Sequence, residues 1–299
     1  MFDLSFLQKL TSISPRYGID ESKGAQVIID ELKSSNINFV EEPFESSVPR
    51  ITKAELLVDG EAVPCLGCSF SSGQIVSKEF IHSSPHADNI SVVSFYDQPS
   101  LAISRIDQEI INNAKVINGN ITVVKEDFFT KNILVGNIIN PQNIIFAHHD
   151  SIIGPGAMDN GCAVAMLVDI IKSDPNSLTK NLFIFAGNEE ISYDEYPEDI
   201  VDYDGHGFRV FESKHQDILE SAKQIFVVDG IGLSSPNLTK TDLKLVLQFR
   251  NLEKYSSKTY WLQNDQSLVM KNYHSTNDVI ENIDVKFINE AKNLLVSKL

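Results

Sequence analysis

The sequence has little positive charge. Lysine and arginine together number 25 against 41 aspartates and glutamates, which gives a net charge of −16. Proteins that bind nucleic acid or an anionic membrane surface need a basic face, which this composition does not offer. We therefore expect a soluble protein with neither nucleic acid nor membrane among its partners. The acidic balance also fits a site that attracts cations.

Cysteine is scarce, and long apolar runs are absent. Three cysteines are an odd and low number, so no disulfide framework is implied. No run is long enough to span a bilayer. The first residues, MFDLSFLQKL, lack the basic start and the small-residue cleavage site of a secretory signal. These absences predict a reduced, cytoplasmic protein.

The length of 299 residues and the hydrophobic content of 42% allow one large or two modest domains with a substantial core. From residue 133 onward, apolar strand-like runs alternate with helical patterns. This alternation predicts an α/β fold with a three-layer open mixed sheet and helices on both faces. Strands are expected at 133–138, 144–147, 182–186, 225–228 and 243–249, and helices at 3–12, 20–35, 161–171, 208–222 and from the N-cap Asp284 to the end.

Residues 45–130 have a different texture, with short β-like runs separated by Gly, Ser, Pro and Asn. Strands are expected at 51–58, 90–95 and 121–124, and one helix at 107–114. The pattern predicts a small β-rich subdomain inserted into a catalytic domain built from 1–44 and 131–299.

Two groups of candidate metal ligands within this insert are weak. Cys65 and Cys68 form a single CLGC pair, and without a second pair they are more typical of small buried residues in a turn between strands than of a zinc site. His86 and Asp88 have ligand side chains but no partner motif nearby, so we expect them in a surface turn.

Candidate ligands follow three of the expected strands. His148 ends the first, Glu189 and Glu190 follow the second, and Asp229 follows the third. Because the carboxyl ends of parallel strands meet at one edge of a sheet, these side chains are expected to converge on one crevice. A single carboxylate at a strand end is usually a cap or a solvated charge, but several in step are not explained in that way.

Two further candidates complete this set. Asp159 opens the helix after the first strand, and His274 lies in the late loop YHSTND. Two imidazoles with three or four carboxylates suit zinc, with cobalt or manganese as substitutes. The set is too rich for one tetrahedral ion, whereas two ions that share a bridging carboxylate would use all of it.

The order and approximate spacing of five motifs resemble one family, the co-catalytic dinuclear zinc aminopeptidases, such as bacterial leucyl aminopeptidase and aminopeptidase S. Glutaminyl cyclases and glutamate carboxypeptidases are relatives of this family. The resemblance covers residues 131–299 and, more loosely, the first forty. The motifs are HHD at 148–150, GAMDN at 156–160, NEE at 188–190, VVDG at 227–230 and YHSTND at 273–278.

The resemblance implies a role for each ligand. Asp159 would bridge two zinc ions, His148 and Asp229 would complete the first site, and Glu190 and His274 would complete the second. A zinc exopeptidase-like fold is implied with them.

The resemblance also implies the residues around the ligands. Glu189 would be the general base that takes a proton from the attacking water and later delivers one to the leaving amine. Asp150 would orient the ring of His148, and the Asp159–Asn160 peptide bond would be cis. His149 should point to the other side of the sheet, because side chains alternate along a strand, and should serve packing.

The expected activity is that of a zinc metallopeptidase, an aminopeptidase that acts on small peptides. A glutaminyl cyclase is an alternative that uses one zinc, and the complete set of ligands for two ions argues against it. A carboxypeptidase would need a basic residue to hold the substrate carboxylate, for which Arg209 and Arg250 are candidates. A non-catalytic binding relative would have lost ligands that are present here. Assembly into a homo-oligomer stays open.

The chain departs from the family pattern in three segments. Residues 189–204 carry eight acids and no base, which indicates a solvated loop or an acidic rim that attracts a free amino terminus, with Tyr193, Tyr196 and Tyr203 as stacking surface. Only 45 residues separate Asp229 from His274, so the residue preference stays open. The insert could be a reduced protease-associated domain, a lid or a dimer arm.

Overall fold

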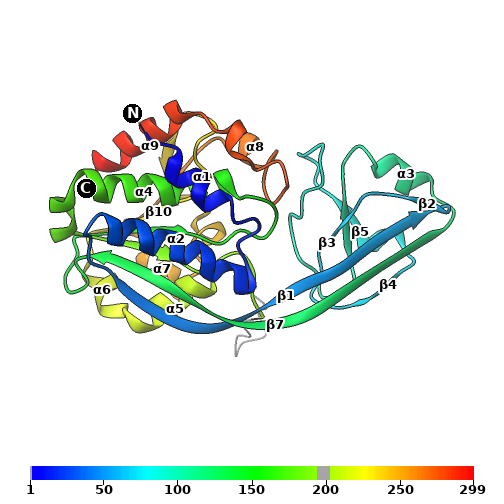
Figure 1. The fold of residues 1–299 in the computed structure, drawn as a ribbon, viewed down its shortest axis with the longest axis horizontal. Helices are drawn as coiled ribbons and strands as arrows, with labels where there is room; N and C mark the ends of the chain where they lie inside the picture. The colour runs from blue at the N-terminus through cyan, green and yellow to red at the C-terminus, as the bar shows by residue number, and fades with distance from the viewer. Residues whose placement is uncertain (1, 194–202) are drawn as a thin grey trace.

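A computed structural model describes residues 2–193 and 203–299. It shows an α/β body with a large mixed sheet and helices on both faces, from which a long two-stranded ribbon extends to the insert (Figure 1). The sheet runs in the order β11-β12-β10-β8-β9-β7-β1-β2, and β4 pairs with β7. The predicted fold class is confirmed.

The centre of the sheet is formed by short parallel strands. These are β9 (Asn181–Ala186), β8 (Asn143–His148), β10 (Gln224–Val228) and β12 (Thr259–Gln263). Every residue of β8 and β9 is buried, as is usual for parallel strands with both faces covered. At one edge, β11 (Asn237–Thr239) pairs antiparallel with β12.

Alternate residues of these strands pack into two separate cores. Ile145 and Phe183 face the core beneath helices α1, α2, α4 and α9, whereas Ile144 and Phe146 face the core on the side of α5, α6 and α7. The bounds are α1 Ser5–Thr11, α2 Glu21–Ser34, α4 Cys162–Ser173, α5 His206–Lys214, α6 Gln216–Ser221, α7 Leu252–Tyr255 and α9 Val285–Val296.

The ribbon that carries the insert consists of β1 (Val40–Val58) and β7 (Ile117–Gly136). Their antiparallel pairing extends from Val40↔Leu134 to Val58↔Ile117, with a register shift between Ile51 and Lys53. Both strands cross the expected boundaries at 45 and 130 without a break, so the division into domains stays a prediction. The other elements of the insert are β2 Glu61–Ala62, β3 Leu66–Gly67, β4 Gly73–Ile75, β5 Ile81–Ser83, β6 Leu101–Ile103 and α3 Gln108–Asn113.

Two expected strands are wrong. Residues 90–95 form no strand and contribute only a bridge between Ser91 and Ser275. Residues 243–249 contain the 3-10 turn Leu243–Leu245, and their buried positions, 243 and 246–249, do not alternate as in a half-buried strand. The strand in this region is β12, whose Thr, Tyr and Trp are typical strand formers.

Smaller features differ from expectation as well. The helix expected at 208–222 is divided into α5 and α6 at His215. The CLGC segment contains strand β3 rather than a turn, with Cys68 buried and Cys65 partly buried. His86 and Asp88 are exposed in bends, as expected. Within residues 2–193 and 203–299, no helix is both long and apolar enough to cross a bilayer.

Candidate metal centre

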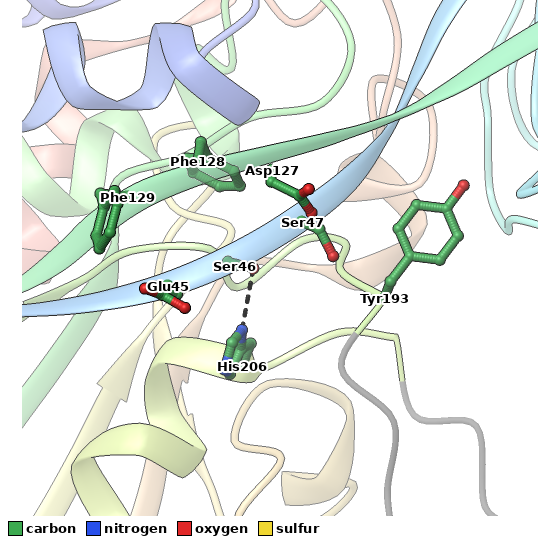
Figure 2. A pocket seen from close by; sticks show the side chains of 8 residues that line it. All are labelled: Glu45, Ser46, Ser47, Asp127, Phe128, Phe129, Tyr193 and His206. Carbon is green, nitrogen blue, oxygen red and sulfur yellow. Dashed lines mark hydrogen bonds between the residues drawn. The ribbon is translucent and has the colours of Figure 1, made fainter.

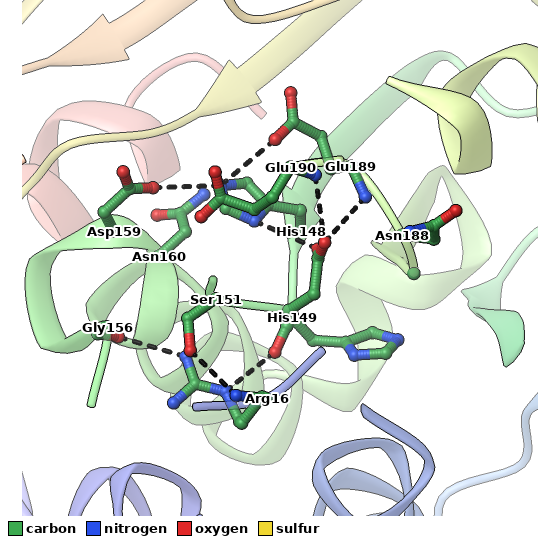
Figure 3. A network of polar contacts seen from close by, with 12 residues as sticks. Arg16, His148, His149, Ser151, Gly156, Asp159, Asn160, Asn188, Glu189 and Glu190 are labelled. Carbon is green, nitrogen blue, oxygen red and sulfur yellow. Dashed lines mark hydrogen bonds and ion pairs between the residues drawn. The ribbon is translucent and has the colours of Figure 1, made fainter. Parts of the chain in front are cut away.

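The parallel pairing of β9, β8 and β10 brings their carboxyl ends to one edge of the sheet. His148 is the last residue of β8 and lies beside Ala186, the last residue of β9. Glu189 and Glu190 follow in the turn after β9, and Asp229 comes directly after β10. The structure therefore brings these segments together, and Figure 3 shows His148, Glu189 and Glu190 side by side.

The five predicted ligands form two groups that share Asp159. One group is His148, Asp159 and Asp229, and the other is Asp159, Glu190 and His274; within each group the ligand atoms lie within 4.8 Å of one another. His148 Nε2 is 3.1 Å from Asp159 Oδ1, and His274 Nε2 is 3.5 Å from Asp159 Oδ2. The two oxygens of one carboxylate thus face two different imidazoles, as a bridging ligand requires.

The remaining distances also suit two cation sites. Asp229 Oδ1 lies 3.8 Å from His148 Nε2, and Glu190 Oε2 lies 2.6 Å from His274 Nε2. Glu190 Oε1 is buried without a hydrogen-bond partner, although buried polar atoms are normally paired. Oxygen and imidazole donors in this arrangement fit zinc.

The electrostatics point the same way. Burial, and then the charge of Asp159, raises the pKa of Glu190 to about 7. Burial also raises the pKa of Glu189 well above its ordinary value. Carboxylates crowded away from water are unfavourable unless cations compensate them. Two divalent ions at the shared site would supply that compensation.

A glycine-containing loop positions Asp159. Gly156 has φ 57°, in the left-handed region that favours glycine, and Asp159 lies in the irregular turn Ala157–Gly161 that precedes α4. The backbone N–H groups of Met158 and Asp159 donate to the carboxylate of Asp278, at 2.7 and 3.0 Å. The Asp159–Asn160 bond is cis, as the resemblance implied.

Asp150 connects the strand end to the turn that carries the two glutamates. Its Oδ2 accepts from the backbone N–H groups of Glu189 and Glu190, both at 2.9 Å, and its Oδ1 lies 3.3 Å from His148 Nδ1. Glu189 belongs to neither ligand group, and its Oε2 is 3.9 Å from His148 Nε2. Its carboxylate is therefore beside the ligands without being one of them.

His149 points away from the ligands, as expected (Figure 3). It is fully buried, its Nε2 lies 3.3 Å from the Lys131 carbonyl, and burial lowers the pKa of the ring to about 4. A neutral ring in this place serves packing. The structure brings together all seven predicted site residues, while their chemical roles stay predictions.

Sequence reasoning missed Arg16 and Glu21, and gave Asp278 no role although it lies in the YHSTND motif. Arg16 is fully buried, and its guanidinium donates to the carbonyls of His149, at 2.8 Å, and Gly156, at 3.1 Å. Glu21 Oε1 accepts from the backbone N–H of Asn188, at 2.9 Å, directly before the glutamate pair. Neither Arg16 nor Glu21 lies in a motif that signals this role.

The insert contributes to the surroundings of the centre. The ring centroid of Phe70, a residue of the insert, lies 5.0 Å from the ring centroid of Tyr193 and 5.6 Å from that of Tyr203. Tyr196 and most of the expected acidic rim fall in 194–202, outside the described residues. Arg209 is buried, and its guanidinium donates to the Asp204 carbonyl.

A separate cavity of about 570 Å³ lies beside the ribbon (Figure 2). None of the five predicted ligands lines it. Ser46 Oγ lies 3.1 Å from His206 Nδ1, which is itself 3.2 Å from Asn188 Oδ1, so this pocket is connected to the residue before Glu189. The lining residues are Glu45, Ser46, Ser47, Asp127, Phe128, Phe129, Tyr193 and His206.

Comparison with known proteins identifies a peptidase family that is similar to part of this chain. Residues 135–196 match the model of Peptidase family M28. No curated protein matches the chain. The predicted resemblance to the zinc aminopeptidases is confirmed, and the enzyme class it indicates is that of zinc metallopeptidases.

Solved structures share the fold at low sequence identity. BSAP, a zinc aminopeptidase from Bacillus subtilis, is 15% identical with a TM-score of 0.69, and the match covers 98% of this chain and 92% of that one. A peptidase M28 precursor from Shewanella amazonensis is 13% identical with a TM-score of 0.73, covering 98% and 91%. The glutaminyl cyclase of Porphyromonas gingivalis is 11% identical with a TM-score of 0.53, covering 98% and 94%.

Proposed function

We propose that this chain is a zinc-dependent exopeptidase, an aminopeptidase that hydrolyses the N-terminal peptide bond of small peptides. The observation that carries the proposal is the pair of ligand groups that share Asp159, with the carboxylate of Glu189 beside them. The M28 match and the aminopeptidase fold support the same class.

Zinc bound in both groups would polarise the scissile carbonyl and lower the pKa of the attacking water. His148 and Asp229 would hold one ion, Glu190 and His274 would hold the other, and Asp159 belongs to both groups. The desolvated environment that raises the pKa of Glu189 makes it a stronger base than an ordinary glutamate.

Proton movement is then assigned to residues outside the ligand set. Glu189 accepts the proton of the water and delivers one to the leaving amine. Asp150 keeps the turn and the ring of His148 in register for this step, because one carboxylate contacts both.

A glutaminyl cyclase activity is the second candidate, since solved cyclases share the fold. It is expected to need only one zinc, and this chain keeps a complete second group around His274. Zinc content therefore discriminates the two: two ions per chain favour the peptidase, and one favours the cyclase. Cobalt and manganese are proposed as substitutes, which metal titration of the demetallated protein would check.

The test is mass spectrometry of a mixed peptide pool after incubation with the zinc-loaded protein. Ladders shortened from the N-terminus establish an aminopeptidase and read out its residue preference. Shortening from the C-terminus indicates a carboxypeptidase, and loss of ammonia from peptides that begin with Gln indicates a cyclase. An untouched pool would refute peptide hydrolysis.

The base is tested by Glu189→Ala. The variant should keep both zinc ions, because Glu189 belongs to neither ligand group, and its kcat should fall by about 10² to 10⁴. Zinc content and initial rates are measured on the same sample. Activity near that of the wild type would remove Glu189 from this role.

The second ligand group is tested by His274→Ala. This change removes the only imidazole of that group, so the zinc content should fall from two ions to one. His149→Ala is the matched control, because its imidazole is also buried but points away from the ligands. An unchanged zinc content in His274→Ala would contradict the assignment.

A further inference from the structure

The insert returns to the body of the protein at the loop that carries His274. Ser91 and Ser275 form an antiparallel bridge, and the N–H of Val92 donates to the carbonyl of His274 at 3.0 Å. Ser91 Oγ donates to the carbonyl of Tyr273 at 2.7 Å. A segment of the insert thus pairs with the loop at Ser275 and donates hydrogen bonds to the carbonyls of the two preceding residues, one of which is a predicted ligand.

The same segment contacts the imidazole. His274 Nδ1 lies 3.0 Å from the carbonyl oxygen of Val92. A carbonyl only accepts, so Nδ1 must carry the proton of the neutral ring. The lone pair is then on Nε2, which faces Glu190 Oε2 at 2.6 Å and Asp159 Oδ2 at 3.5 Å. Val92 therefore selects the tautomer that can bind a metal.

The backbone at His274 also depends on its neighbours. Its φ of 44° lies in the left-handed region, which is uncommon for a residue other than glycine and persists where surrounding contacts fix it. Two of those contacts, at the Nδ1 and at the carbonyl oxygen, come from Val92. In the other group, by contrast, His148 contacts Asp150 of the body.

We propose that the insert is a working part of the second metal site. In this inference, which rests on the proposed function, Val92 is a positioning residue for His274, and docking of residues 91–92 sets the affinity of the Asp159, Glu190 and His274 group for zinc. The first group, with His148 and Asp229, has no such dependence.

The coupling must act in both directions, because linkage between two binding equilibria is reciprocal. Zinc in the second group fixes the ring of His274 and so stabilises the docked insert. The insert is joined to the body through the β1–β7 ribbon, whose pairing is irregular between Ile51 and Lys53. The Val92–His274 contact is the point at which the insert reaches a predicted ligand.

The full-length protein tests the proposal through zinc affinity at each site, measured by competition with a chelator. Val92→Pro removes the N–H that binds the His274 carbonyl and shifts the backbone around the carbonyl that binds Nδ1. Its second-site Kd should rise by about 10- to 100-fold, the usual effect of losing a partner of a metal ligand, with the first-site Kd unchanged. Ser91→Ala should give a smaller rise in the same Kd.

Ser100→Ala is the matched control. Ser100 is a buried serine of the same insert, and its hydroxyl donates to the Gln98 carbonyl rather than to the body. It should change neither Kd. An unchanged second-site Kd in Val92→Pro, or equal effects of Ser91→Ala and Ser100→Ala, would overturn the proposal.

Hydrogen exchange on the unmodified protein covers the case in which Val92→Pro does not fold. When enough zinc is added to fill the second site, exchange of the Val92 amide should slow. Equal exchange rates with and without zinc would refute the coupling. These outcomes are distinct from failure of the proposed function, in which the wild type would bind fewer than two zinc ions or leave all peptides intact.

Discussion

Arg16 places a positive charge in the interior beneath the ligand loop. Its guanidinium donates to carbonyls of His149 and Gly156, on both sides of the turn that leads to Asp159. Burial lowers the pKa of Arg16 to about 10, so the side chain stays charged at neutral pH. The group therefore connects the end of β8 to the loop and offsets part of the buried negative charge.

Replacing Arg16 by Met should destabilise the fold by about 3 to 5 kcal/mol, because it leaves buried carbonyls unpaired and carboxylates uncompensated. The loss is measured as a shift of the urea midpoint. Arg16→Lys is the informative control, since its ammonium keeps the charge but cannot reproduce the planar guanidinium fork. Its urea midpoint should lie between those of Arg16→Met and the wild type. Equal stability of Arg16→Met and the wild type would show that the charge is not needed.

The sequence made the ligands easier to predict than the residues that hold them. Metal chemistry restricts ligands to a few side-chain types, and parallel strands bring their carboxyl ends together, so His148, Glu190 and Asp229 could be recognised. Arg16 and Glu21 act on backbone groups more than 130 residues away in the chain. Any buried polar side chain could do this, and nothing in the local sequence distinguishes those that do.

At the scale of single elements, α9 shows how a local signal fixes a boundary. Asp284 precedes the helix, and its carboxylate accepts from the N–H of Lys286 at 2.8 Å, as the sequence predicted. Asp284→Ala should lower stability by about 1 kcal/mol, the usual value of a lost N-cap. Asp284→Asn keeps an acceptor and should unfold like the wild type. A thermal melt that ranks the two variants equally would contradict the capping role.

Helices and strands were predictable where the apolar pattern of the sequence matched the way the element is covered in the fold. β8, β9 and β10 are apolar between their first residues and their carboxyl ends because both of their faces are covered, and they were placed within one residue at either end. Residues 243–249 are as apolar as a strand, but they cover the core as a turn and adjoining loop. Which apolar run pairs with β10 is decided by the rest of the sheet, so β12 was missed.

At the scale of the whole molecule, the arrangement of body and insert was least predictable. The change of texture at residue 45 was readable, but β1 and β7 extend through it as one ribbon. The contact between Val92 and His274 joins residues 182 positions apart, in a segment that has no regular structure of its own. Such contacts depend on the trajectory of the ribbon, which no local pattern specifies.

The net charge of −16 should govern which peptides arrive fastest. Two divalent ions would offset only part of it, so a cationic peptide is attracted over long range and an acidic one is repelled. Between about 0.01 and about 1 M salt the screening length falls from about 30 to about 3 Å, which removes this attraction. The kcat/KM of a lysine-containing tripeptide should therefore fall by about tenfold over that range.

The matched substrate carries glutamate in place of lysine at the C-terminal position, away from the bond that is cut. Its kcat/KM should rise with salt, because screening removes repulsion instead of attraction. Opposite slopes for the two peptides assign the effect to the field of the whole protein, since a general effect of salt on zinc or on folding would move both rates together. Parallel slopes would mean that the acidic charge of the chain does not select its substrates, and the preference would then have to come from contacts within the site.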